Sequence, residues 1–305
     1  MSVDAIGLSA ELLKAVKACG YKTLTPVQQQ AIPLIRSGVD LLASAQTGTG
    51  KTAAFSLPIL DALAKIPTNN NSSKTIRALI LTPTRELAQQ VARNIETYSE
   101  FLPLSSGAVY GGVNMPPQTK MLKQGVDILV ATPGRLLEHL VARNVDLSQV
   151  KFLVLDEADR MLDMGFLRDI KKILSILPRQ RQNLLFSATF SEDIRDLARG
   201  LVNNPVEISV SPRNTTVESV EQVIYPVDKK KKQGLLTELI KANNWQQVLV
   251  FMKTKHGANK LTKQLEAEGI HAAAIHGNKS QGARTKALAN FKSGTVSVLV
   301  ATDIA

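Results

Sequence analysis

The sequence predicts an α/β protein built on parallel β-sheets. Short apolar runs of the kind that form buried strands alternate with longer helix-compatible segments through the first 205 residues. A glycine-rich turn follows one of these strands, residues 41–43, and leads into a helix-compatible run that starts at Thr52. A cluster of carboxylates ends another strand, residues 151–155. Functional groups at the carboxyl ends of buried strands are typical of open parallel sheets.

The length and charge of the chain set the outer limits. Its 305 residues are enough for two domains, and 44% apolar with 4% aromatic residues is ordinary for an α/β protein. The formal net charge is +11, which favours a polyanionic partner. Charge alone does not separate nucleic acid from an anionic membrane surface.

Several classes of protein are disfavoured. No apolar run approaches the roughly 18 residues of a membrane span, and the N-terminus, with Asp4, does not resemble a signal peptide. A cytoplasmic location without membrane attachment is therefore expected. The single cysteine, Cys19, excludes an internal disulfide. The four histidines lack the spacing of a metal site and are interpreted as surface or packing residues: His139, His256, His271 and His276.

Two helices are predicted before the glycine-rich turn. The first covers Leu8 to Cys19 with Ser9 as its N-cap, and the second begins at Pro26. Gln28 lies in this second helix. Its amide has the donors and acceptors to pair with the amino and N7 positions of an adenine, which a guanine would not satisfy. An ordinary helix glutamine is the alternative.

The glycine-rich turn spans Ala45 to Thr52. In such a turn the glycines let backbone N–H groups approach phosphates, a lysine reaches the β- and γ-phosphates, and a threonine hydroxyl ligates Mg²⁺. Lys51 and Thr52 stand at those positions. Ala45 replaces the first glycine of the G-x-x-x-x-G-K-[ST] pattern, so the match is one residue short. The alternative is a glycine-rich loop with a solvated lysine.

The carboxylate cluster supplies the second half of a nucleotide site. Asp156 stands where it can take a Mg²⁺ role, and Glu157 where it can orient or deprotonate the attacking water. A solvated acidic turn would not explain why both motifs occur in one chain. Together they predict hydrolysis of ATP or GTP.

Two further strands run into similar turns. Residues 78–81 precede Thr84 and Arg85, and residues 128–131 precede the turn from Thr132 to Arg135. Either arginine alone is readily explained as a surface residue or a helix-terminal ion pair. Two copies, with Gly111-Gly112 between them in the chain, favour a track for a nucleic-acid backbone.

The remaining chain continues the alternation. The strand 183–186 ends in Ser187 and Thr189, small hydroxyl residues that are common in turns and N-caps. Residues 206–305 hold 14 basic and 8 acidic residues, against 23 and 18 before them, so the second segment is more basic per residue. Lys229–Lys232 is interpreted as a solvated helix start and Trp245 as a packing residue. Strands are expected at 248–251 and 297–301, with a helix between them from about residue 257 to 268.

These motifs, in this order, resemble those of DEAD-box ATP-dependent RNA helicases, most closely the bacterial RhlE-type subgroup. The resemblance extends over the whole chain. The residues that carry it are Gly20-Tyr21 with Thr25–Gln28, Ala45–Thr52, Pro83–Leu87, Gly111-Gly112, Thr132–Arg135, Asp156–Asp159, Ser187–Thr189, Val250–Thr254, His276–Arg284 and Val300–Asp303.

The resemblance implies two tandem RecA-like (P-loop NTPase) parallel-sheet domains, the second incomplete. The ATP-binding domain would cover residues 1–207, with its Q motif at 20–28. A linker at 208–218 and a partial helicase C-terminal domain at 219–305 would follow.

It also implies an enzyme that binds ATP, Mg²⁺ and RNA and locally unwinds or remodels RNA duplexes by ATP hydrolysis. Catalytic roles fall to Lys51, Asp156 and Glu157, and Mg²⁺ ligation to Thr52 and Asp156. ATP binding would involve Tyr21, Gln28, Ala45, Gln46, Thr47, Gly48, Thr49, Gly50, Lys51 and Thr52. RNA binding would involve Thr84, Arg85, Gly111, Gly112, Thr132, Pro133, Gly134, Arg135, Thr254, Gln281 and Arg284.

Ser187 and Thr189 would couple the nucleotide site to RNA unwinding through contacts to the acidic motif. The RNA contacts would fall on the sugar-phosphate backbone, so little sequence preference is expected. The resemblance is also compatible with protein partners in RNA processing or ribosome assembly.

The sequence departs from the family pattern at both ends. Val3 stands where the family has an aromatic that stacks on adenine, a contact worth about 1–3 kcal/mol, so weaker ATP binding is expected. The sequence stops at Ala305, before the His-x-x-Gly-Arg-x-x-Arg-type motif, and Arg284 is its only arginine after Arg213. A fragment with impaired turnover is therefore expected, because arginine fingers contribute about 10³ to 10⁵ in rate. Val298–Val300 is expected to form an uncovered apolar edge.

Two other function classes fit part of the pattern. A non-catalytic RNA-binding or annealing module would keep the basic tracks without turnover. A DNA-directed motor would keep the ATPase but would not depend on ribose hydroxyls. RNA-stimulated turnover that is lost on Glu157→Gln would dismiss the first, and equal stimulation by DNA would undermine the RNA assignment.

Overall fold

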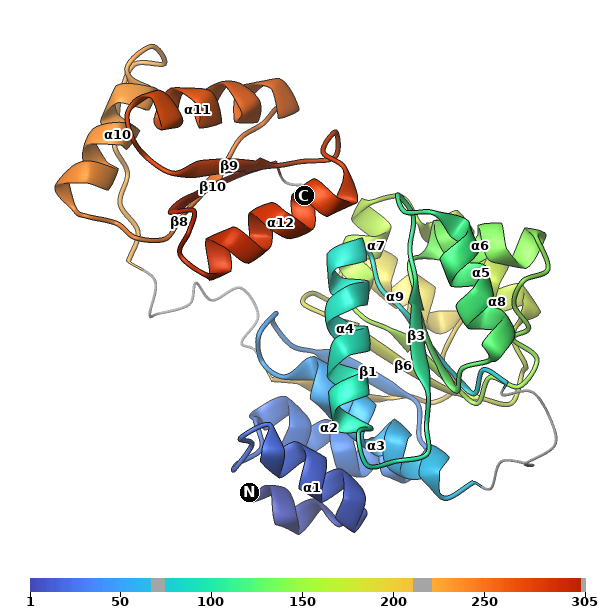
Figure 1. Cartoon of the computed structure of the whole chain (residues 1–305). Helices are drawn as coiled ribbons and strands as arrows, with labels where there is room; N and C mark the ends of the chain where they lie inside the picture. The colour runs from blue at the N-terminus through green and yellow to red at the C-terminus, as the bar shows by residue number, and fades with distance from the viewer. Residues whose placement is uncertain (67–74, 211–220, 303–305) are drawn as a thin grey trace. The chain divides into compact units, whose positions relative to one another are not determined.

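The computed structural model describes residues 1–66, 75–210 and 221–302. The chain divides into two compact units, Met1–Thr215 and Thr216–Ala305 (Figure 1). Each unit is a parallel β-sheet with helices on both faces, so the predicted α/β class is confirmed.

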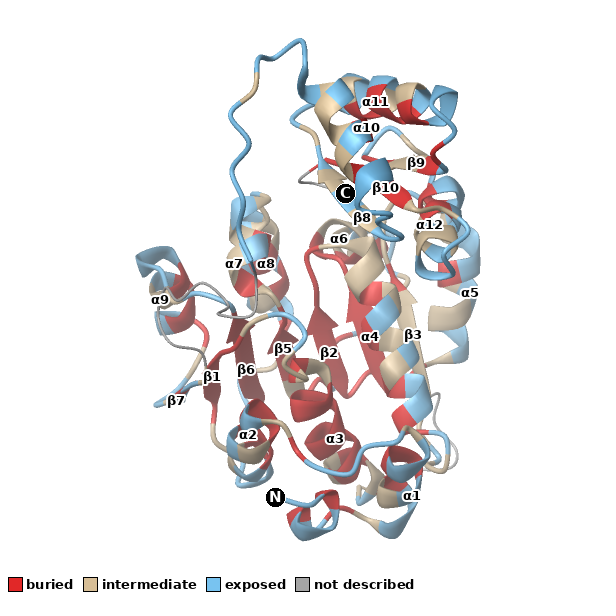
Figure 2. Ribbon diagram, turned by 90° about the vertical axis from the view of Figure 1, so that its left-hand side faces the viewer, coloured by how far each residue is buried: buried red, intermediate tan, exposed pale blue. Residues whose placement is uncertain are grey.

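The first unit contains a seven-stranded sheet in the order β3-β4-β2-β5-β6-β1-β7, and all of its strand pairs are parallel. Its strands are β1 (Leu41–Ser44), β2 (Ala78–Leu81), β3 (Ser106–Val109), β4 (Ile128–Ala131), β5 (Phe152–Leu155), β6 (Gln182–Ser187) and β7 (Val206–Ser209). The five strands between the two edges, β4, β2, β5, β6 and β1, are almost entirely buried (Figure 2). Such continuous apolar runs are what helices on both faces of a parallel sheet require.

Helices cover both faces of this sheet. Alternate residues of each strand point to opposite faces, so Ile80 joins one hydrophobic core while Leu79 and Leu81 join the other. The first core is closed by a short 3₁₀ helix (Val3–Ile6) and by α1 (Ala10–Ala18), α2 (Pro26–Arg36), α3 (Lys51–Ala64) and α4 (Arg85–Tyr98). The second is closed by α5 (Met115–Gln124), α6 (Pro133–Val141), α7 (Ala158–Asp163), α8 (Leu167–Ile176) and α9 (Glu192–Arg199).

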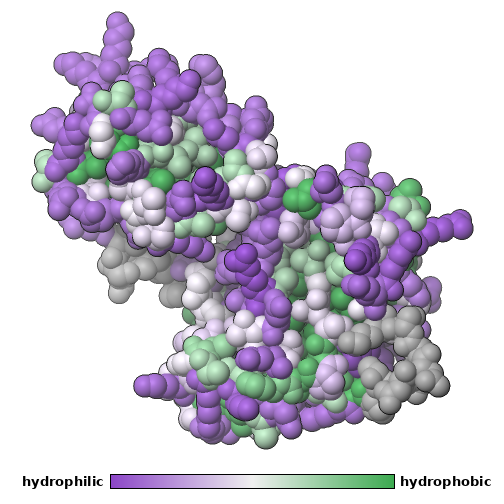
Figure 3. Space-filling view, viewed as in Figure 1, coloured by the Kyte–Doolittle hydropathy of each residue, from purple (hydrophilic) through white to green (hydrophobic). Residues whose placement is uncertain are grey.

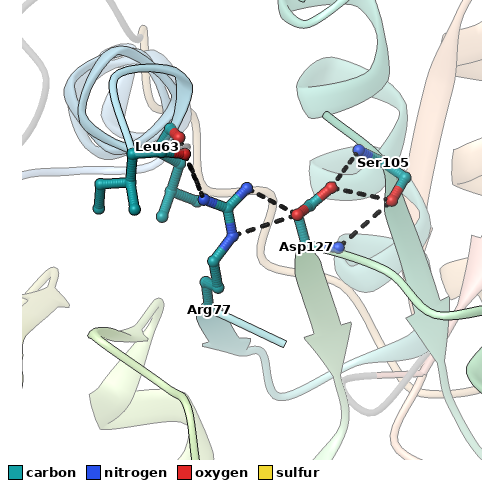
Figure 4. A network of polar contacts seen from close by, with 5 residues as sticks. Leu63, Arg77, Ser105 and Asp127 are labelled. Carbon is teal, nitrogen blue, oxygen red and sulfur yellow. Dashed lines mark hydrogen bonds and ion pairs between the residues drawn. The ribbon is translucent and has the colours of Figure 1, made fainter. Parts of the chain in front are cut away.

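A buried ion pair closes the amino edge of the sheet (Figure 4). Arg77 donates to Asp127 Oδ1 from Nε (3.1 Å) and Nη2 (2.6 Å), and its Nη1 donates to the Leu63 carbonyl (3.1 Å) at the end of α3. The backbone N–H and hydroxyl of Ser105 donate to the other Asp127 oxygen at 2.8 and 3.0 Å. The pair therefore joins α3, β2, β3 and β4 with its polar groups satisfied.

The second unit has three strands in the order β8-β10-β9: β8 (Val248–Phe251), β9 (Ala272–Ile275) and β10 (Val298–Ala301). Its helices are α10 (Lys232–Ala242), α11 (Lys255–Ala267) and α12 (Gln281–Lys292). Lys229–Lys232 is exposed at the start of α10, as predicted. Figure 3 shows a hydrophobic patch among the hydrophilic side chains on the visible face of this unit.

The predicted uncovered edge at Val298–Val300 was wrong. Strand β10 is the central strand, paired with β8 on one side and β9 on the other, and Val298 and Val300 are fully buried. The edge strands among the described residues are β8 and β9, and on β8 Leu249 is 50% and Phe251 67% exposed. Trp245, interpreted as a packing residue, is 41% exposed.

Strand β7 extends to Ser209, two residues beyond the predicted end of the first domain at residue 207. Most of the predicted linker falls in residues 211–220, outside the described residues. Among the helices of the described ranges, none is long and apolar enough to cross a membrane. His139 and His276 are buried, as their packing interpretation requires.

The network at the amino edge yields a stability prediction. Replacing Asp127 by alanine leaves the Arg77 guanidinium buried without its counterion, which we expect to cost about 3–5 kcal/mol of unfolding free energy. Urea unfolding of the two proteins measures the difference. The matched control is Asp4→Ala, which breaks the exposed Asp4–Lys17 pair and should leave the midpoint unchanged. If both variants lose similar amounts of unfolding free energy, the buried Arg77–Asp127 pair has no special role in stability.

Candidate functional site

The predicted site residues of the first unit gather at one edge of its sheet. Because the strands are parallel, their carboxyl ends meet at the same edge, and the loops that follow β1, β2, β4, β5 and β6 all lie there. These loops hold Ala45–Gly50, Thr82–Thr84, Thr132, Asp156-Glu157 and Ala188-Thr189.

The glycine-rich loop wraps the start of α3. The Ala45 N–H donates to the Ser187 carbonyl at 3.0 Å, and Gly48 and Gly50 adopt φ values of +85° and +93°. Ala45 is fully buried, so its methyl group is accommodated where the pattern has glycine. Lys51 is 6% exposed and its Nζ donates to the Ala45 carbonyl at 3.1 Å, across the loop. The loop thus places a lysine and a helix N-terminus together, as a phosphate site requires.

Gln28 lies directly against this loop. Its Oε1 accepts from the Thr25 N–H at 2.9 Å, as part of a capping box, and its Nε2 donates to the Gly50 carbonyl at 3.1 Å. A Cβ on Gly50 would lie 2.4 Å from Gln28 Nε2, so only glycine fits there. Gln28 therefore ties α2 to the phosphate loop. The Thr25-x-x-Gln28 spacing is a capping-box signal that could have revealed the Thr25 contact from sequence.

Tyr21 and Val3, near the N-terminus, differ in their exposure to solvent. Tyr21 is 38% exposed, and its hydroxyl is hydrogen-bonded to that of Tyr98 at 2.9 Å. Val3 is 1% exposed and belongs to the hydrophobic core. The Val3 side chain therefore offers almost no exposed surface to a ligand.

Asp156 follows β5 and is 2% exposed. Burial raises its pKa to about 6, although the positive charge of Lys51 acts in the opposite direction. Among the described residues, its Oδ1 has no hydrogen-bond partner. A carboxylate oxygen and a threonine hydroxyl are oxygen ligands of the kind that Mg²⁺ prefers, so the chemistry of Asp156 and Thr52 fits the predicted metal. The described ranges contain no cluster of three or more His, Cys, Asp or Glu, and a Mg²⁺ bound with substrate phosphates needs none.

Glu157 adopts a left-handed backbone conformation, with φ +55° and ψ +53°. This conformation is strained for a residue other than glycine, and such strain clusters at functional sites. The Thr47 hydroxyl donates to Glu157 Oε1 at 3.2 Å, which joins the acidic motif to the glycine-rich loop. The sequence gives no sign of this backbone conformation.

Asp159 connects the acidic motif to the turn after β6. Its Oδ2 accepts from the backbone N–H groups of Ala188 (3.0 Å) and Thr189 (3.1 Å) and from the Thr189 hydroxyl (3.3 Å). The Ser187 hydroxyl donates to the Thr189 carbonyl at 2.7 Å. Sequence reasoning named Ser187 and Thr189 but missed Asp159 as the acceptor that joins Thr189 to the acidic motif.

The predicted RNA-binding residues of the first unit also lie together. Thr84 caps α4, and the guanidinium of Arg85 lies against Gly112, where a Cβ would be 1.8 Å from Nη1. Arg135 donates from Nη1 to the Val113 carbonyl at 3.1 Å and pairs with Glu138 at 2.8 Å. Both arginines therefore contact the Gly111–Val113 loop.

The turn from Thr132 to Arg135 has open space beside its backbone at Gly134. Thr132 stands at the N-cap of α6 and Pro133 at its first position. A Cβ on Gly134 would meet nothing within 4 Å. The backbone at this turn is therefore accessible to a close ligand.

The predicted residues of the second unit share one edge of its own sheet. Thr254 follows β8 and caps α11, where its hydroxyl accepts from the Gly257 N–H at 3.0 Å. Gln281 and Arg284 lie in the first turn of α12, which follows β9. Both are buried, at 7% and 6% exposure.

The fold and this site define a class. One strand of a parallel sheet leads through a Gly-Lys-Thr loop into a helix, and carboxylates end a nearby strand. This combination is typical of P-loop nucleotide-binding proteins. Residues 25–197 match the DEAD/DEAH box helicase family, and residues 231–305 match the helicase conserved C-terminal domain. The chain therefore belongs to the DEAD/DEAH box helicase family.

Curated relatives of known name agree. An ATP-dependent RNA helicase CshA from Limosilactobacillus reuteri is 41% identical over 305 residues, which are 100% of this chain and 60% of the relative. The DEAD-box ATP-dependent RNA helicase RhpA from Helicobacter pylori is 38% identical over 304 residues, again 60% of its length. The chain thus spans about 60% of the length of these relatives.

Solved structures that match almost the whole chain are also similar. S. cerevisiae Dbp5 bound to RNA and ADP BeF3 matches with a TM-score of 0.87 and 30% identity, over 99% of this chain and 75% of that one. A DEAD box protein from the hyperthermophile Methanococcus jannaschii matches with a TM-score of 0.64 and 37% identity, over 100% and 80%. The RecA-like architecture predicted for the chain is therefore confirmed.

The raised pKa of Asp156 yields a prediction. Its folded-state pKa of about 6 lies above the ordinary value of 3.8, so protonation stabilises the folded chain at low pH and this stability is lost as pH rises through 6. Asp156→Asn mimics the protonated form. We expect it to raise the unfolding free energy of the ligand-free chain at pH 7.5 by up to about 3 kcal/mol, and by less at pH 5. Urea unfolding at the two pH values measures this.

The same substitution should weaken Mg²⁺-dependent nucleotide binding, because a neutral amide oxygen is a weaker ligand of Mg²⁺ than a carboxylate. A variant that is less stable than the parent at pH 7.5 would contradict the predicted cost of the buried charge.

Proposed function

We propose that this protein is an ATP-dependent RNA helicase that binds ATP with Mg²⁺, binds RNA, and remodels short RNA duplexes by ATP hydrolysis. One observation carries the proposal. At the carboxyl edge of the seven-stranded sheet, Thr47 joins the phosphate loop to Glu157, and Asp159 joins the acidic motif to Thr189. The arginine-bearing turns follow strands β2 and β4 at this same edge.

The nucleotide would be held by the loop from Ala45 to Thr52. Lys51 would exchange its contact with the Ala45 carbonyl for the phosphates, and the N-terminus of α3 would add backbone N–H donors. Thr52 and Asp156 would hold Mg²⁺, which when bound neutralises charge on the phosphates. Gln28, which contacts the loop at Gly50, and Tyr21 would bind the base.

Glu157 would position and deprotonate the attacking water. The water oxygen bonds to the γ-phosphorus, its proton passes to the Glu157 carboxylate, and the bond to the bridging oxygen breaks to release ADP. The hydrogen bond from Thr47 and the left-handed backbone at Glu157 fix the direction of this carboxylate. Thr189, which is hydrogen-bonded to Asp159, and Ser187, which is hydrogen-bonded to Thr189, would transmit the state of the nucleotide to the RNA-binding side.

RNA would contact the first unit through Thr84, Arg85, Gly111, Gly112 and the turn from Thr132 to Arg135. These groups offer backbone N–H groups, hydroxyls and guanidinium charge, which suit phosphate and sugar oxygens rather than base edges. Thr254, Gln281 and Arg284 would contribute from the second unit. Dbp5, at 30% identity, is similar over almost the whole chain and was solved with RNA, which supports this assignment.

The finer predictions from sequence accompany this proposal. They are the domain limits 1–207, 208–218 and 219–305, the RhlE-type subgroup, a cytoplasmic location, and protein partners in RNA processing or ribosome assembly. The relatives reported above carry CshA and RhpA names, so the RhlE-type assignment rests on the sequence motifs alone.

Steady-state ATP hydrolysis with and without single-stranded RNA tests the proposal. Glu157→Gln should keep nucleotide binding and lower RNA-stimulated turnover by about 10²-fold or more, the usual contribution of a general base. The matched control is Asp163→Asn, which changes an exposed carboxylate at the end of α7 and should leave turnover unchanged.

Two results would contradict the proposal. Unchanged turnover in Glu157→Gln would remove the role of this residue. Equal stimulation by single-stranded DNA would point to a motor that does not read ribose hydroxyls.

A further inference from the structure

A buried chain of polar side chains lies behind the loop from Tyr110 to Val113. His139, on α6, is fully buried, and Gln118, on α5, is 7% exposed. His139 Nε2 is 3.2 Å from Gln118 Oε1, and Gln118 Nε2 donates to the Tyr110 carbonyl at 3.1 Å. Burying a polar group without a hydrogen-bond partner is costly. A buried network whose members are hydrogen-bonded to one another therefore favours a single arrangement of these side chains.

The partners of His139 fix its tautomer. Asn144 lies 3.3 Å from Nδ1 through its Nδ2, which can only donate, so Nδ1 is the acceptor and Nε2 carries the proton. Burial lowers the pKa of His139, and the nearby charge of Arg135 acts in the same direction, so the ring is neutral at neutral pH. The Nε2 proton is then donated to Gln118 Oε1.

This proton decides which way the Gln118 amide faces. With Oε1 accepting from His139, Nε2 is directed at the Tyr110 carbonyl and donates to it. If the amide turned over, two oxygens would face each other at Tyr110 and two N–H donors at His139. His139 therefore sets the hydrogen bond that holds the peptide group between Tyr110 and Gly111.

The same helix holds the other end of the loop. Arg135 lies four residues before His139, on the same face of α6, and donates to the Val113 carbonyl at 3.1 Å. Helix α4 repeats this arrangement: the guanidinium of Arg85 lies against Gly112, and Gln89, four residues later, donates to the Tyr110 hydroxyl at 2.7 Å. Gly111 and Gly112 therefore lie in a segment that is hydrogen-bonded at both ends, at Tyr110 and at Val113.

We propose that His139 is a positioning residue for RNA-backbone binding, acting through Gln118 on the Tyr110–Val113 loop. The inference rests on the proposed RNA-binding function of this loop. Glycine loses more conformational freedom on ordering than any other residue, so Gly111-Gly112 needs external anchors to be held in one shape. An anchored loop binds its ligand without a further ordering cost.

Fluorescence anisotropy with a labelled single-stranded oligouridylate tests the inference on the full 305-residue chain. His139→Leu should raise the RNA Kd about tenfold, a difference of about 1.4 kcal/mol. The ATP Kd without RNA should stay within about twofold, because the phosphate loop does not contact His139. His139→Gln, which restores an N–H donor, should recover most of the affinity.

Two further variants guard against a loss of folding. Gln118→Met removes the contact with Tyr110 at similar volume and should reproduce the effect of His139→Leu. Ser105→Ala removes a partly buried hydrogen bond to Asp127 at the opposite edge of the sheet and should leave RNA binding unchanged. If His139→Leu and Gln118→Met weaken ATP binding as much as RNA binding, the role of these residues is merely structural and the inference is overturned. The inference is also overturned if Ser105→Ala weakens RNA binding as much as these two variants do.

Arg85→Gln separates this inference from the proposed function. If Arg85→Gln weakens RNA binding while His139→Leu and Gln118→Met do not, the positioning role is wrong and the RNA track stands. If Arg85→Gln has no effect on RNA binding, the track itself is wrong, and the positioning role is overturned with it.

Discussion

The parallel pairing of the seven strands is the constraint on which the rest of this structure depends. Since every strand runs the same way, the loops after β1, β2, β4, β5 and β6 must share one edge, whatever their distance in sequence. Hydrophobic strands buried on both faces make any other register or direction costly. The phosphate loop, the acidic motif and the arginine turns are therefore brought together by the packing of apolar residues that take no part in chemistry.

The two edges of this sheet treat polar groups in opposite ways. At the amino edge, Arg77 pairs with Asp127, and Asp40 accepts from the N–H groups of Asn183 at 2.7 Å and Asn203 at 2.8 Å. At the carboxyl edge, Asp156 carries a buried oxygen with no partner in the described residues, and Glu157 holds a strained backbone. The satisfied polar groups at the amino edge stabilise the fold. The unpartnered oxygen and the strained backbone at the carboxyl edge destabilise it, and a bound ligand would offset part of that cost.

Much of this could be predicted from the sequence, and the failures have physical causes. Strongly apolar strands such as Ala78–Leu81 and Ile128–Ala131 were predicted at their observed bounds. β3, β7 and β9 were not, because Ser106–Val109 and Ala272–Ile275 are rich in small residues and Val206–Ser209 is a largely exposed edge. Strand order is a tertiary property, so β10 was wrongly expected at an edge. Asp159, Gln118 and His139 were missed because their partners lie far away in sequence.

Hydrogen exchange measured by mass spectrometry, with Mg²⁺-ATP and with single-stranded RNA added separately, tests most directly whether one edge of the sheet binds both ligands. We expect ATP to slow exchange in residues 45–52 and 156–159. RNA should slow exchange in 84–86, 111–113 and 132–135, on the neighbouring loops. Protection by RNA that is confined to Lys229–Lys232, with none at these loops, would contradict the proposed site.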